Sequence, residues 1–273
     1  MGTNSILSNL NSEDMISTIR LEMGNDLKKE NIYLLIEGFD DKKLFQYLCN
    51  NNVVVCESYS GKKGIEEILS AFNENYRILG IRDRDYETRK LDDRIFFYDY
   101  CCMEMMLVNM NEVFERVFYE YYEGSIDFED LRYEILEKLK TLSVLRKVNE
   151  YHRKMWNFKG INRQIIFNNT DFNEEELYKE LSRVNNREIC EDDNIRNEKE
   201  NTRNYNDLLS LTNGHDFIDL FIIYCKKENG KNLKINTISE TMRCSCSLEN
   251  FKQSVLYNDL FKYQTENNIK IIK

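Results

Sequence analysis

Four carboxylates stand where two short apolar runs of the sequence end. The runs are residues 32–36 (IYLLI) and residues 78–81 (ILGI), and both stop abruptly at charged turn residues. The acids that follow them are Glu37, Asp41, Asp83 and Asp85. Such runs are typical of buried parallel strands, and open α/β sheets bind ligands at the carboxyl ends of their strands. Because four neighbouring acids repel one another unless a cation compensates them, the spacing predicts a site for Mg²⁺ or Mn²⁺.

Strands and helices alternate around these acids. We expect a helix over 12–28, strands over 32–36, 53–56, 77–81 and 94–98, helices over 40–49 and 65–72, and a turn over 60–64. Alternation of this kind favours right-handed crossovers and a mostly parallel sheet. The predicted fold class is therefore α/β, with a four-stranded sheet flanked by helices.

The second half of the chain follows a helical pattern. Helices are predicted over 103–120, 128–147, 208–225 (interrupted or started at Gly214) and 248–261, with a short strand over 234–237. The polar, charge-dense stretch from 148 to 213 shows no clear element. We therefore expect a catalytic domain over 1–120 and a mainly helical region over 121–273 packed on it.

The arrangement of the acids resembles TOPRIM domains, which occur in topoisomerases, primases, ribonuclease M5 and OLD-type nucleases. A strand followed by Glu-Gly-x-x-Asp, then a strand followed by Asp-x-Asp, is the TOPRIM signature, and residues 37–41 and 83–85 match it. Within this family, the chain is similar to OLD-like TOPRIM proteins that act as anti-phage effectors. This similarity lies in the sequence of residues 36–43 (IEGFDDKK), in Tyr86 and in the element 213–216 (NGHD). The match covers about residues 30–110 closely and the remainder only loosely.

The resemblance implies a metal-dependent nuclease. Two metals about 4 Å apart can polarise a phosphate, activate water and stabilise the leaving oxygen. The resemblance makes Glu37, Asp83 and Asp85 catalytic, with Glu37 as general acid or base, and it makes Glu37, Asp41, Asp83 and Asp85 metal ligands. Glu104, which follows the fourth predicted strand, is a further candidate ligand, and a solvated glutamate is the equal alternative. The chain is too short for a topoisomerase and lacks the zinc-finger spacing of a primase, so hydrolysis remains.

Two sets of cations are candidates for binding nucleic acid. Lys62 and Lys63 follow the second predicted strand and are placed to contact a phosphate, although solvated lysines are the commoner case. Residues 146–163 interleave basic with aromatic side chains, a pattern that suits unstacked bases and their backbone. The alternative is a helix face with one aromatic anchor. The candidate contacts in this basic-aromatic strip are Arg153, Lys154, Trp156 and Lys159.

The composition of the chain restricts the expected nucleic-acid target and the cellular compartment. The net charge of −10 argues against nonspecific binding to duplex DNA, which depends on positive charge. No apolar run approaches a membrane span, and residues 1–30 have no signal-peptide core, so we expect a cytoplasmic protein with reduced cysteines. The basic-aromatic strip and the acidic net charge, together with the resemblance, favour RNA, such as a tRNA loop, over DNA.

Partners also follow from the resemblance. Such effectors are silenced by a separately encoded ABC-type ATPase, and this chain carries no phosphate-binding loop of the form G-x-x-x-x-G-K-[ST]. A homodimer is expected in the active state. The alternative functions are a ribonuclease M5-like maturase and a regulatory module that binds metal or nucleotide without hydrolysis.

Overall fold

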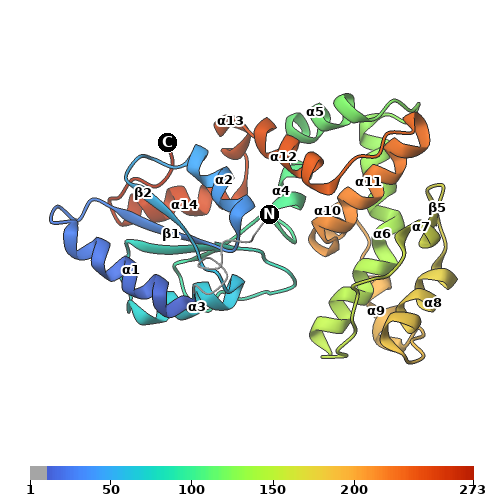
Figure 1. Ribbon diagram of the computed structural model, residues 1–273, viewed down its shortest axis with the longest axis horizontal. Coiled ribbons are helices and arrows are strands. Elements are labelled where there is room, and N and C mark those ends of the chain that lie inside the picture. The colour runs from blue at the N-terminus through green and yellow to red at the C-terminus, as the bar shows by residue number, and fades with distance from the viewer. Residues whose placement is uncertain (1–10) are drawn as a thin grey trace, which may run out of the picture. The chain divides into compact units, whose positions relative to one another are not determined.

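The computed structural model describes residues 11–273, which divide into two compact units (Figure 1). The sheet unit consists of the chain up to Met103 together with Cys246–Lys273, and the helical unit is Glu104–Ser245. The sequence-based division at residue 120 kept the C-terminal helices with the helical region. In the structure these helices belong with the sheet.

The sheet unit contains four parallel strands in the order β2-β1-β3-β4. Its strands are β1 (Ile32–Ile36), β2 (Val53–Glu57), β3 (Ile78–Arg82) and β4 (Ile95–Phe97). Its helices are α1 (Ser12–Asn25), α2 (Phe39–Leu48), α3 (Gly61–Ala71), α13 (Leu248–Phe251) and α14 (Val255–Glu266). The α/β class and the parallel four-stranded sheet predicted from the sequence are confirmed.

Helices cover both faces of this sheet (Figure 1). On one face, α1 and α3 bury Ile19, Ile65 and Ile68 against strand residues such as Tyr33 and Leu35. Gly80 is required here, because a Cβ atom on it would lie 2.4 Å from Cγ2 of Ile65. On the other face, Phe45 of α2 packs edge-on against Phe251 of α13 with 5.9 Å between the ring centroids.

The C-terminal segment joins the sheet unit through specific polar contacts. Asp99 accepts hydrogen bonds from the amides of Val255 and Leu256, at 2.8 and 2.9 Å, and so caps α14. Cys49 forms an antiparallel bridge with Ile272. These contacts span more than 150 residues of sequence, which explains why local patterns did not reveal them.

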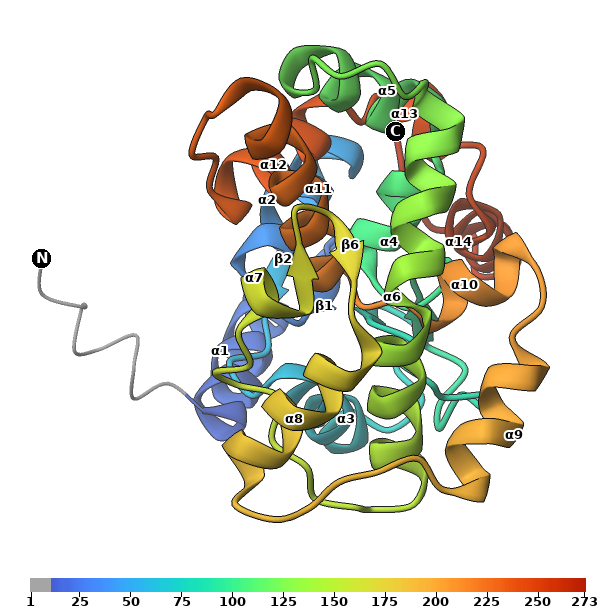
Figure 2. The same cartoon turned by 90° about the vertical axis from the view of Figure 1, so that its right-hand side faces the viewer.

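The helical unit is built around the long helix α6 (Phe128–Tyr151). Phe114 lies in the core of this unit, and its ring centroid is 5.3 Å from that of Phe217 and 5.3 Å from that of Phe221. The other elements are α4 (Met103–Asn109, which begins on the last residue of the sheet unit), α5 (Asn111–Tyr121), α7 (Arg163–Ile166), β5 (Phe167–Asn168), β6 (Asp171–Phe172), α8 (Glu174–Asn185), α9 (Asp193–Asn201), α10 (Tyr205–Leu211), α11 (Gly214–Asn229) and α12 (Ile235–Ser245). Figure 2 shows α9 and α10 lying beside α6.

Several boundaries differ from the sequence-based prediction. The expected turn at 60–64 is the first turn of α3, and the expected helices over 103–120 and 248–261 are each divided in two. The helix start predicted at Gly214 is confirmed, since α11 begins there. The strand predicted over 234–237 is wrong, because Ile238 and Met242 place a buried helical stripe there. The polar stretch 148–213 forms short helices whose first turns are capped by Asn162, Asn173, Asp192 and Asn204. Among the helices of residues 11–273, none has the length and apolar character needed to cross a membrane.

Candidate active site

The predicted acids lie at one edge of the sheet. Ile36 pairs with Ile81 in the parallel ladder, so β1 and β3 end side by side. Glu37 follows β1 directly, and Asp83 follows β3, which ends at Arg82. The sequence therefore placed these two acids correctly relative to the strand ends.

Glu37 is the most perturbed carboxyl group at this edge. Its Oε1 accepts a hydrogen bond of 2.9 Å from the amide of Asp83. Burial raises the pKa of Glu37 to about 7, the Asp83 amide opposes this rise, and the negative charges of Asp41 and Asp85 add to it. A group with a pKa near neutrality can both take up and release a proton at physiological pH.

The donors that hold Asp41 include a backbone amide and a tyrosine hydroxyl. One oxygen accepts a hydrogen bond of 3.1 Å from the amide of Gly38, the N-cap residue of α2, and this is one half of a capping box, because glycine has no side chain to supply the other half. The other oxygen accepts a hydrogen bond from the hydroxyl of Tyr98, which follows β4. Asp41 is thus fixed at the site edge and also serves the helix end, which is the ordinary role of an acid at this position.

Asp83 and Asp85 differ in their surroundings. Asp83 accepts a hydrogen bond of 3.3 Å from the amide of Met103. Asp85 forms an ion pair of 3.2 Å with Lys62, whose Nζ also lies 3.6 Å from Glu87. Lys62, one of the two lysines predicted to meet a phosphate, therefore lies in the acidic cluster, and Lys63 is exposed in the first turn of α3.

The loops at this edge adopt unusual backbone conformations. Tyr59, Asp85 and Tyr100 follow β2, β3 and β4, and their φ angles are 58°, 48° and 63°. For bulky residues this left-handed region is uncommon. Positive φ angles also occur at other places in residues 11–273, such as Lys29 and Met155, so they describe the loops and do not by themselves mark a site. Gly61 also has a positive φ of 58°, and a Cβ atom there would lie 3.7 Å from Oε2 of Glu37.

A buried arginine beneath the acids escaped the sequence analysis. Arg82 is fully buried and donates hydrogen bonds of 3.1 and 2.5 Å to the two carboxylate oxygens of Glu87. It also lies 3.3 Å from Glu66 of α3. Arg82 partly neutralises the acidic edge, and it is the last residue of β3, where the sequence suggested the start of a charged turn and gave no sign of burial.

Two further residues at the edge were missed. Glu57 ends β2, and its Oε1 is buried without a hydrogen-bond partner among the described residues. Phe39, two residues after Glu37, is 61% exposed, and the Nζ of Lys43 lies 4.6 Å from its ring centroid. An exposed ring beside a cation is suited to stacking on a base.

The chemistry of these donors suits a hard cation. The oxygens are carboxylates, which Mg²⁺ prefers, and burial is the main cause of the raised pKa of Glu37, with a smaller contribution from the negative charges of Asp41 and Asp85. Within residues 11–273, however, no three side chains of His, Cys, Asp or Glu form a group arranged to hold a metal ion. Lys62 beside Asp85 and Tyr98 on Asp41 occupy oxygens that a cation would use.

Glu104 is the first residue of the helical unit and lies in the first turn of α4. Its side chain is half-buried. Its proposed role as a ligand stays a prediction.

The basic-aromatic strip is largely paired with acids of the helical unit. Lys147 lies 2.5 Å from Glu198, and Lys154 lies 2.9 Å from Asp192. Trp156 is half-buried, whereas Arg153 and Lys159 are exposed. The cations that remain open for nucleic acid are therefore fewer than the sequence suggested.

The element 213–216 has a structural role within the helical unit. Asn213 caps α11 by accepting hydrogen bonds from the amides of His215 and Asp216. Asp216 is fully buried and pairs with Arg146 at 2.6 Å and with Arg163 at 2.5 Å. His215 is exposed.

Compared with known proteins, the sequence matches no protein-family model and no curated protein.

Proposed function

We propose that this chain is an Mg²⁺-dependent TOPRIM endonuclease that hydrolyses phosphodiester bonds, with RNA such as tRNA favoured over DNA. The observation that carries the proposal is the environment of Glu37. Its pKa is raised to about 7 by burial and by the neighbouring acids, at the edge where parallel strands place their ligands. Perturbed acids of this kind are typical of catalytic groups.

The residues have distinct roles in this proposal. Glu37 accepts or returns a proton at the reacting oxygen, and the Asp83 amide fixes the orientation of its carboxylate. Asp41, Asp83 and Asp85 would hold Mg²⁺ together with Glu37, and the bound ion would supply charge stabilisation and a more acidic water. Because Lys62 is already beside Asp85, it is placed to move onto a substrate phosphate when the cation arrives.

The choice of RNA rests on charge and on exposed rings. A net charge of −10 disfavours duplex DNA, whose binding is dominated by phosphate neutralisation. Phe39 offers a stacking surface near Glu37, and stacking requires unpaired bases such as those of a loop.

The biological setting is proposed from the resemblance to OLD-like anti-phage effectors. In that setting the nuclease is cytoplasmic, an ABC-type ATPase encoded nearby keeps it silent, and the active form is a homodimer. Inspection of the neighbouring genes tests this directly. An adjacent ATPase gene supports it, whereas ribosomal RNA processing genes point to a maturase similar to ribonuclease M5.

The decisive experiment compares cleavage of tRNA and plasmid DNA by the purified chain with Mg²⁺ and with EDTA. Glu37→Gln and Asp83→Asn should each lower the Mg²⁺-dependent rate by about 10²-fold or more, because each removes an acid from the reacting centre. Glu67→Gln is the matched control, because Glu67 is exposed on α3 and its substitution removes the same charge away from the reacting centre. Cleavage by Glu37→Gln at the wild-type rate contradicts the proposal.

The rival function is a regulatory module that binds metal or nucleotide without hydrolysis. The hydrogen bonds already made by Asp41 and Asp85 with protein donors favour it. Calorimetric titration with Mg²⁺ separates the two. Binding that is lost in Asp83→Asn, combined with no cleavage of any nucleic acid even with the ATPase present, selects the rival.

A further inference from the structure

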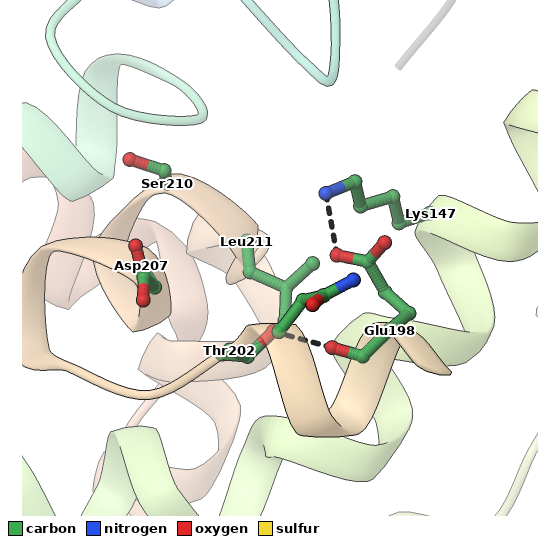
Figure 3. Close-up of a pocket in the computed structure, with 7 residues that line it drawn as sticks. Lys147, Glu198, Thr202, Asp207, Ser210 and Leu211 are labelled. Atoms are coloured by element: carbon green, nitrogen blue, oxygen red, sulfur yellow. Dashed lines mark hydrogen bonds and ion pairs between the residues drawn. The ribbon is translucent and has the colours of Figure 1, made fainter. Parts of the chain in front are cut away.

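A polar groove in the helical unit lies between the end of α6 and α9. It encloses about 380 Å³, within the ~300–1,000 Å³ typical of ligand pockets. Polar and aromatic side chains that line it are Lys147, Tyr151, His152, Asn194, Asn197 and Asn201. We call this cavity the α9 groove. An adjoining pocket shares Lys147, Glu198 and Asn201 with the α9 groove. Figure 3 shows this adjoining pocket, with the Lys147–Glu198 pair on one side and Asp207 and Ser210 of α10 on the other.

Three amide side chains line the groove from a single helix. Asn194, Asn197 and Asn201 are spaced by three and four residues, so they share one face of α9. None of the three amide groups makes a hydrogen bond to another side chain or to the backbone among residues 11–273. Each amide can donate and accept at once, which matches the mixed donor and acceptor edge of a nucleobase.

An aromatic ring lies beside these amides. Tyr151, the last residue of α6, is 54% exposed, and the Nζ of Lys147 lies 5.8 Å from its ring centroid. A planar base can stack on such a ring while its edge meets the amides.

The charge of the groove argues against a phosphate as the group it recognises. Lys147, the lysine in the lining, is committed to Glu198 at 2.5 Å, so the pair is internally neutral. Arg153 follows His152 and is exposed, so the charge available for a backbone phosphate lies next to the groove in sequence.

We propose that the α9 groove binds an unpaired nucleobase of single-stranded RNA, with Tyr151 as the stacking surface and the α9 asparagines as readers of the base edge. The identity of the ligand as RNA rests on the proposed function. The groove extends that function by assigning a recognition site to α9, which the basic-aromatic strip did not include.

The test measures binding without cleavage. Fluorescence anisotropy of labelled RNA oligomers of about 12 nucleotides, poly(A), poly(C) and poly(U), is recorded with the full chain in EDTA. Tyr151→Ala should raise the dissociation constant about tenfold, and Tyr151→Phe, which keeps the ring, should stay within about twofold of wild type. Asn197→Ala should weaken the tightest complex and reduce the difference between the three oligomers.

Matched controls use residues outside the groove. Tyr119→Ala removes a tyrosine that is 71% exposed on α5, and Asn206→Ala removes an exposed asparagine on α10. Both should bind as wild type does, and circular dichroism should show that all variants are folded.

Three outcomes overturn the proposal. They are no binding of any oligomer by the wild-type chain, wild-type binding by both Tyr151→Ala and Asn197→Ala, and competition by AMP, CMP or UMP as effective per base as the oligomers. The last result would assign the groove to a free nucleotide. Failure here is distinguishable from failure of the proposed function, because Glu37-dependent cleavage is measured separately.

Discussion

Replacing Glu37 by glutamine should stabilise the metal-free protein at neutral and alkaline pH. Glutamine has nearly the same shape and can still accept the hydrogen bond from the Asp83 amide, 2.9 Å away in wild type. It carries no charge, so it avoids the cost of holding a buried carboxylate near Asp41 and Asp85. Stabilisation by removal of a buried acid is the expected signature of a residue placed for function.

The magnitude follows from the pKa of Glu37. A rise from an ordinary 4.5 to about 7 corresponds to about 3 kcal/mol between the two protonation states. Because the folded protein binds this proton more tightly than the unfolded chain, wild-type stability falls as pH rises from about 4.5 to about 7, and this contribution is constant above that range. The free energy of unfolding of Glu37→Gln minus that of wild type should therefore increase by about 2 kcal/mol between about pH 5.5 and about pH 8.

The assay is urea unfolding followed by circular dichroism at several pH values, with EDTA present. The difference between variant and wild type cancels the titration of all groups that do not interact with Glu37. Glu67→Gln controls for the loss of one negative charge, since Glu67 is exposed on α3, and its stability should run parallel to wild type. A constant difference between Glu37→Gln and wild type across this pH range would refute the reasoning.

Three further predictions concern the framework. Asp216→Ala should lower the free energy of unfolding by about 3–5 kcal/mol in urea denaturation, because Arg146 loses the buried carboxylate it pairs with, while Arg163 keeps only its ion pair of 3.0 Å with Asp219. A loss below about 1 kcal/mol would contradict this. Gly80→Ala should cost about 1–3 kcal/mol in the same assay, because the added Cβ would lie 2.4 Å from Ile65, and a silent substitution would show that α3 can shift away. In thiol labelling of the native protein at about pH 8, Cys190 and Cys244 should react first because they are exposed. Burial raises the pKa of the thiols at 49, 56, 225 and 246 to about 12, so these should react slowly. Peptide mapping that finds the buried thiols labelled equally fast would show that the core opens.

The sequence by itself determined the strands, the crossovers and the acids that end them. Runs such as 32–36 and 78–81 are short, apolar and without alternation, a pattern typical of a strand covered on both faces. A parallel sheet then brings its carboxyl ends to one edge, so Glu37 and Asp83 had to be neighbours once β1 and β3 paired. Local pattern and topology were sufficient for this part of the candidate site.

The tertiary structure decided how each acid is held and what lies around it. The hydrogen bond of Tyr98 to Asp41, the pairing of Lys62 with Asp85 and the burial of Arg82 join residues from different elements, so no local spacing encodes them. The same holds for Asp99, which caps α14 from more than 150 residues away and draws the C-terminal helices onto the sheet. Periodicity records which face of an element is apolar, whereas the partner of a polar side chain depends on which elements the fold brings together.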